Sequence, residues 1–166
     1  MDYLWSPWRM DYIKSDKTPH QCVFCEALKQ NNDEEMLILT RAEHSFIILN
    51  RYPYNNGHLM VVPYAHKATL NELDAETRAE MMELLSKVES MLKMEYRPEG
   101  INMGVNIGAA AGAGVADHIH FHVVPRWNGD VNFMGAVALT RVLPEDLWQT
   151  YQRMKKAWEV IEAGGH

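Results

Sequence analysis

The fold of this chain is decided by the stretch His118-Ile119-His120-Phe121-His122-Val123-Val124. Successive side chains of a β-strand point to opposite faces, so the three histidines share one face and the apolar residues share the other. The spacing therefore predicts a strand over His118–Val124 that packs one face on the core. The structural alternative is a set of satisfied histidines on a solvated face. Three of eight histidines in strict alternation argue against that alternative.

Two kinds of chemistry fit this row of imidazoles. All three rings can hold a catalytic zinc ion whose remaining ligand is water. Alternatively, one imidazole is a nucleophile and its neighbours orient it. The preceding loop favours the nucleophile, because Gly108, Gly112 and Gly114 are free to adopt positive φ angles. Such a loop can turn backbone N–H groups toward a phosphate-sized anion.

The surrounding sequence predicts an α+β domain with a mainly antiparallel sheet, because strands cluster with few helices between them. A long central helix is expected after Asp74, where apolar residues recur at helical spacing until Pro98 and Gly100. A C-terminal helix is expected over residues 144–163. The remaining expected elements are a short helix at Cys22–Gln30 and strands at Met36–Thr40, Ser45–Leu49, His58–Pro63 and Ile101–Asn106.

Length and charge limit the possible functions. A chain of 166 residues suits one compact domain. Its net charge of −6 disfavours binding to nucleic acid, which normally requires a basic face. No apolar run is long enough to cross a membrane, and the first ten residues lack a secretory pattern, so we expect a cytoplasmic protein. Residues 1–20 are rich in Trp and Tyr, and we expect them to form an arm that packs on the body or on a second subunit.

Residues His118–Arg126 resemble the signature of the histidine-triad (HIT) family, in which three histidines alternate with apolar residues. Upstream, Phe46–Arg51 and Gly57–Pro63 resemble the strand pair that holds the nucleoside. The resemblance covers a core of residues 22–127 and implies a single HIT domain over residues 1–166. The Trp-rich amino terminus and Pro125–Asp130 resemble the bacterial branch that includes diadenosine tetraphosphate phosphorylases and hydrolases.

This resemblance implies an enzyme that cleaves a nucleotide phosphoanhydride, such as that of a dinucleoside polyphosphate, through a nucleotidyl-histidine intermediate. His120 would attack the α-phosphorus while a backbone carbonyl fixes its other ring nitrogen, and His122 would contact phosphate oxygens or the scissile bridge. The other implied substrate-binding residues are Phe46 and Ile48 at the base, Asn50 at the ribose, and Asn106, Gly112 and Gly114 at the phosphates. A nucleotide-binding regulatory protein with little catalysis is the alternative.

One position departs from the family pattern. Hydrolase members with two-adenosine substrates carry Gln four residues before the first histidine, where this chain has Gly114. The departure favours phosphorolysis or transfer over plain hydrolysis. The sequence leaves the choice between water and phosphate open.

Cys22-Val23-Phe24-Cys25 has the spacing of half a structural zinc site. Two buried apolar cysteines are an alternative, and a redox pair is a weaker one because no βαβ pattern surrounds it. The resemblance adds His66 and His118, which would complete a structural zinc site that pins the N-terminal segment to the triad strand. His44 is a spare ligand candidate, and His58 is expected to serve the turn or the fold.

The resemblance also implies a homodimer, because family members pair through the long helix and an adjacent strand. Ile101–Asn106 is the strand that would pair with its copy. Apolar helix residues (Met81, Leu85, Val88 and Leu92) and the anchors Trp5 and Trp8 would add contact area. Alternatively, the helix and the arm cover only their own chain.

Overall fold

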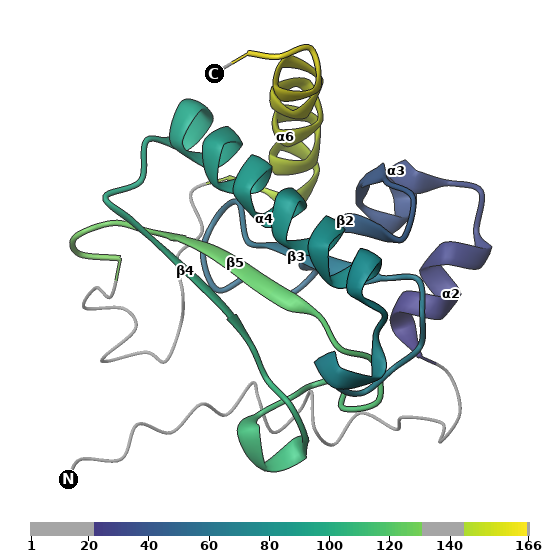
Figure 1. Cartoon of the computed structure of the whole chain (residues 1–166). Coiled ribbons are helices and arrows are strands. Elements are labelled where there is room, and N and C mark those ends of the chain that lie inside the picture. Colours follow the sequence, from purple (N-terminus) through teal and green to yellow (C-terminus); the bar gives the residue numbers. More distant parts are fainter. Residues whose placement is uncertain (1–21, 131–144, 166) are drawn as a thin grey trace, which may run out of the picture.

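The computed structural model describes residues 22–130 and 145–165, in which helices lie against one antiparallel sheet (Figure 1). In chain order the elements are α2 (Val23–Lys29), α3 (Asp33–Met36), β1 (Ile38–Arg41), β2 (Ser45–Leu49), β3 (Leu59–Pro63), η1 (Leu70–Glu72), α4 (Ala75–Tyr96), β4 (Gly100–Val105), η2 (Ala109–Ala111), β5 (Phe121–Arg126) and α6 (Leu147–Glu162). The predicted N-terminal arm, residues 1–20, lies outside the described residues. In the part that is described, no helix is long and apolar enough to span a membrane.

The sheet has five strands in the order β1-β2-β3-β5-β4, and every neighbouring pair is antiparallel. Its register aligns one row of residues across four strands: Ile48 lies opposite Met60, Met60 opposite His122, and His122 opposite Gly104. Directly opposed residues point to the same face. The predicted antiparallel α+β fold is therefore confirmed, and the triad strand sits between β3 and the edge strand β4.

The long helix α4 packs one apolar face into the core, as its apolar spacing predicts. The side chain of Asp74 caps its first turn by accepting a hydrogen bond from the Thr77 N–H at 2.7 Å. The helix contacts β2, β3 and β5 on one side and α6 on another. Its buried apolar residues are Met81, Leu84, Leu85, Val88, Met91 and Leu92. Because these side chains already fill the chain's own core, the expectation that several of them serve a dimer interface is wrong.

The start of the triad strand differs from the prediction: β5 begins at Phe121, not at His118. The neighbouring strand β3 ends at Pro63, whose nitrogen carries no hydrogen to donate to a ladder. The N–H of Ile119 instead donates to the carbonyl of Lys67 at 2.7 Å. The first two histidines therefore occupy the extended approach to β5.

Two other boundaries also differ. The C-terminal helix α6 begins at Leu147 rather than near residue 144, which lies outside the described residues. Asp146 adopts extended backbone angles and caps the helix by accepting from the Gln149 N–H at 2.9 Å, so the helix starts after it. Strand β1 begins at Ile38 because the short helix α3, capped by Asn32, occupies the residues before it. The remaining boundaries agree within a residue or two.

Candidate active site and metal cluster

His120 lies at the centre of the triad with its ring almost completely buried. Its Nδ1 is 2.9 Å from the backbone carbonyl of His118. A carbonyl only accepts hydrogen bonds, so Nδ1 carries the proton and Nε2 keeps its lone pair. Burial lowers the pKa of His120, which keeps the ring neutral near pH 7. His120 therefore presents an uncharged, nucleophilic Nε2.

The two ring nitrogens of His122 have the opposite hydrogen-bonding roles to those of His120. Its Nδ1 lies 3.0 Å from Nε2 of His58, and Nδ1 of His58 accepts the backbone N–H of Tyr54 at 3.1 Å. With the proton of His58 on Nε2, Nδ1 of His122 accepts and its Nε2 carries the hydrogen. Burial, together with the charge of His120, lowers the pKa of His122 to about 4. Neutral His122 thus offers an N–H donor next to the His120 ring, whose centroid is 4.8 Å away.

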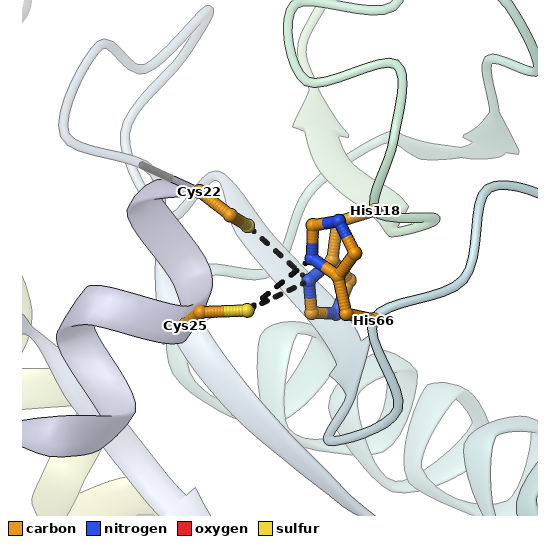
Figure 2. A group of neighbouring side chains, drawn as sticks. All are labelled: Cys22, Cys25, His66 and His118. Carbon is orange, nitrogen blue, oxygen red and sulfur yellow. Dashed lines mark hydrogen bonds between the residues drawn. The ribbon is translucent and has the colours of Figure 1, made fainter. Parts of the chain in front are cut away.

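His118, the first triad histidine, faces a different group of side chains. Its ring is fully buried, and Nε2 donates to the carbonyl of Pro63 at 2.8 Å. The lone pair of Nδ1 therefore points at the thiols of Cys22, at 3.3 Å, and Cys25, at 3.6 Å. Nδ1 of His66, in the loop after β3, lies 3.3 Å from the Cys25 thiol. Figure 2 shows the two cysteines at the start of α2 facing the two imidazoles.

We call Cys22, Cys25, His66 and His118 the Cys/His cluster, and its geometry fits a tetrahedral metal ion. The four ligand atoms lie within 4.8 Å of one another. Zinc bonds of about 2.3 Å to sulfur and about 2.0 Å to nitrogen place tetrahedral sulfur and nitrogen ligands about 3.5 Å apart. Burial, and then the Cys22 thiol, raise the pKa of Cys25 to about 11, so a thiolate here needs a bound cation. The four residues that the resemblance implies are thus brought together.

The expected spare ligand, His44, is not part of this cluster. It belongs to a separate group with Glu43 and Glu80, in which the Glu80 carboxylate accepts the backbone N–H groups of the other two residues. The Glu80 carboxylate thus satisfies backbone N–H groups in the turn between β1 and β2. Among the described residues, neither possible ligand group includes His120 or His122. The geometry therefore does not support a zinc ion held by all three triad histidines.

The residues expected at the nucleoside lie on the triad side of the sheet. Ile48 shares the cross-strand row of His122. Asn106 directly follows Val105, which ends β4 and lies opposite Phe121. Phe46 is completely buried and stacks on Tyr64, with ring centroids 5.9 Å apart. A contact between Phe46 and a base stays a prediction.

Asn50 is linked to the triad through His58. Its side-chain oxygen accepts the Tyr52 N–H at 2.9 Å, and its amide nitrogen lies 3.4 Å from both ring nitrogens of His58. The residue expected at the ribose thus also contacts the histidine that orients His122.

The glycine-rich loop differs from the prediction in two ways. Gly108 and Gly112 have φ angles of 82° and 88°, but Gly114 is absent from the positive-φ residues of the described chain. The N–H of Gly112 donates to the carbonyl of Ala109 at 3.0 Å within the turn η2. Gly112 therefore does not present this N–H to a ligand in the observed conformation. A phosphate contact by Gly114 stays a prediction.

Sequence reasoning missed two residues of the site. His58, expected to serve only the turn or the fold, sets the tautomer of His122. Phe24, between the two cysteines, packs against His118 and His120. A signal for His58 was present, because His58 directly precedes a strand that pairs with the triad strand.

Known proteins resemble this chain in sequence and in fold. The family model described as HIT domain matches residues 31–129. AP-4-A phosphorylase of Mycobacterium tuberculosis is 40% identical over 164 residues, which cover 93% of this chain and 83% of the relative. Adenosine 5′-monophosphoramidase of Schizosaccharomyces pombe is 34% identical over 107 residues, covering 64% and 75%. The solved structure of a Zn-bound histidine triad family protein from Mycobacterium smegmatis matches with a TM-score of 0.70 and 27% identity, covering 87% and 97%.

Proposed function

This chain belongs to the HIT domain family, and on that basis we propose that it is an enzyme that cleaves a nucleotide phosphoanhydride through a nucleotidyl-histidine intermediate. The observation that carries the proposal is that the Nε2 atoms of two adjacent rings have opposite hydrogen-bonding roles. His120 presents a lone pair on Nε2, and His122 presents a hydrogen on Nε2. A nucleophile beside a hydrogen-bond donor is the pairing that displacement at phosphorus requires.

In the first step, Nε2 of His120 attacks the α-phosphorus, so that a P–N bond forms while the bridging P–O bond breaks. The leaving nucleotide departs as an anion that accepts a hydrogen bond from Nε2–H of His122. The ring of His120 becomes positively charged, and the His118 carbonyl bound to its Nδ1–H stabilises that charge. In the second step an oxygen of the acceptor attacks the same phosphorus, the P–N bond breaks, and neutral His120 is restored.

We propose inorganic phosphate as the acceptor. Gly114 offers no side-chain amide where family hydrolases with two-adenosine substrates carry Gln. The 40% identical relative, moreover, is named a phosphorylase. With diadenosine tetraphosphate as substrate, attack at the α-phosphorus releases ATP and phosphate then converts the bound AMP group to ADP.

Product analysis with and without phosphate tests this function. Diadenosine tetraphosphate is incubated with the protein, and the nucleotides are separated by chromatography. ADP plus ATP, formed only with phosphate, is the expected result. AMP plus ATP in either condition means hydrolysis. Nucleotide binding without turnover under both conditions overturns the enzyme and favours the regulatory alternative.

We further propose that the Cys/His cluster binds one structural zinc ion. The donor set of two sulfurs and two imidazole nitrogens is closed by protein ligands, as in structural rather than catalytic sites. The Zn-bound relative supports this assignment. Bound zinc would hold the start of α2 against the approach to β5, far apart in sequence but adjacent in space (Figure 2).

A homodimer formed through β4 is the proposed assembly. The outer edge β1 is blocked, because Tyr151 and Lys155 donate to the carbonyls of Ile38 and Leu39. The other edge, β4, has side chains that are half-buried or exposed, and Met103 is 40% exposed. Two copies of β4 could pair across a twofold axis.

The expected anchors Trp5 and Trp8 lie outside the described residues. Cytoplasmic location and the absence of nucleic-acid binding stay predictions.

A further inference from the structure

Phe24 lies where the Cys/His cluster meets the triad. It is in the first turn of α2, between Cys22 and Cys25, and only 3% of it is exposed. Its ring centroid is 4.9 Å from that of His120, with the planes tilted by 53°, and 5.4 Å from that of His118 in an edge contact. One aromatic ring therefore touches both a cluster residue and the central triad histidine.

The hydrogen bond to the His118 carbonyl does not by itself fix the ring of His120. It holds Nδ1 in place, but the ring can still tilt about that bond. Phe24 and His122 are ring neighbours of His120, with centroids 4.9 Å and 4.8 Å away. Close packing by two ring neighbours restricts the tilt and so sets the direction of the Nε2 lone pair.

The position of Phe24 depends in turn on the cluster. The helix α2 has only seven residues, and no side chain caps its N-terminus. Helices this short are not stable alone, so contacts with the rest of the protein hold them. The thiols on either side of Phe24 are 3.3 Å from the imidazoles of His118 and His66. The cluster thus joins the segment that carries Phe24 to the segment that carries His120.

We propose that Phe24 is a positioning residue for the nucleophile and that the Cys/His cluster acts on catalysis through it. The inference rests on the proposed role of His120. In-line attack requires reacting atoms at about 3–3.5 Å with aligned orbitals, and a misplacement of about 1 Å can cost about 100-fold in rate. Loss of the Phe24 ring beside His120 should therefore lower kcat. The substrate contacts that set KM lie elsewhere.

The test is Phe24→Leu in the full-length protein, because leucine keeps an apolar side chain in the core but removes the planar ring. We expect kcat to fall by about 10- to 100-fold with KM within about twofold of the original value. Met154→Ala, a fully buried position on α6, supplies a control in which stability falls without any change next to His120. A Phe24→Leu enzyme with unchanged kcat, or with a loss no larger than in the control, overturns the proposal.

A second measurement does not depend on turnover. In protein labelled at histidine, the ring current of Phe24 displaces the His120 ring resonances, and Phe24→Leu should shift them while Met154→Ala should not. Unshifted resonances overturn the proposal even if the nucleotidyl mechanism holds. If Phe24→Leu shifts the His120 resonances but the separate variant His120→Ala remains fully active, the nucleotidyl mechanism is refuted and the contact is not.

The link to the cluster is tested with Cys25→Ser. If the cluster acts through Phe24, the double variant Phe24→Leu/Cys25→Ser loses no more kcat than the more damaged single variant. Losses that multiply show that the two residues act independently, which overturns the second half of the proposal.

Discussion

Nε2 of His58 donates to Nδ1 of His122 across 3.0 Å, although the two residues are 64 positions apart in the chain. This bond decides on which nitrogen the last triad histidine carries its hydrogen. The N–H of Tyr54 fixes the tautomer of His58 in the same way. His122 is therefore the end of a chain of hydrogen bonds that starts in the loop between β2 and β3.

His58→Leu should lower kcat by about 100-fold. Nδ1 of His122 then no longer accepts a hydrogen bond from His58, and this is the bond that keeps the ring hydrogen of His122 on Nε2. His58→Gln, whose amide can still donate, should retain more activity than His58→Leu. Steady-state kinetics with diadenosine tetraphosphate and phosphate provide the measurement. Equal kcat in the Leu variant and the unmodified protein would mean that His58 only fills the core.

His120→Ala should lower turnover by several orders of magnitude, since a covalent nucleophile has no substitute. Intact-mass measurement after mixing with substrate should detect a nucleotidyl adduct on the unmodified protein and none on the variant. Circular dichroism controls for folding, because His120 is buried. The mechanism is wrong if the folded variant turns over at a near-native rate.

Removal of the proposed zinc ion should destabilise the fold. Zinc that binds only the folded state adds about 4 kcal/mol to the free energy of unfolding when its free concentration is about 1,000 times Kd. Cys25→Ser should lose the metal and a comparable part of that stability. His44→Ala is the matched control, because His44 belongs to the separate group with Glu80, and it should keep one zinc per chain. If metal analysis finds no zinc in protein purified without chelator, the proposed zinc site is wrong. The alternative interpretation, two buried apolar cysteines, then applies.

Stability should depend on pH through His122. Its pKa is lowered from 6.5 to about 4 in the folded state, so between these values the unfolded chain binds more protons than the native one. The free energy of unfolding should therefore rise with pH from about 4 to about 6.5, and the stabilisation is lost as pH falls through that window. Urea titrations at several pH values measure it. The dependence should be shallower in His122→Asn, and an unchanged slope there would contradict the assignment.

Met103→Glu should convert the proposed dimer to a monomer, because Met103 is a partly exposed apolar residue on the edge strand β4. Light scattering at micromolar concentration should give about twice 19.1 kDa for the unmodified chain and 19.1 kDa for the variant. Val160→Glu on α6 is a control at a similarly exposed apolar residue, outside both β4 and the long helix α4. An unmodified chain with a mass of 19.1 kDa rules out the assembly.

The sequence by itself determined the fold class, because that depends on local periodicity. The alternation of His118, His120 and His122 and the helical spacing after Asp74 each report which face of an element is buried. The structure confirms the antiparallel sheet and the central helix. The Cys-x-x-Cys spacing marked half of the cluster, while its two histidines came from family resemblance. Local patterns failed where a neighbouring strand intervened: Pro63 ends β3, and the triad strand therefore starts at Phe121.

Only the tertiary structure decided which ring nitrogens are donors and which are acceptors. His120 is oriented by a local carbonyl, but His122 is oriented by His58 on the neighbouring segment, a pairing that requires the register between β3 and β5. Phe24 reads in the sequence as an ordinary core residue. Its contact with His120 exists because α2 folds back on the approach to β5. Protonation states and ring orientations depend on partners distant in the chain, and local periodicity carries no information about them.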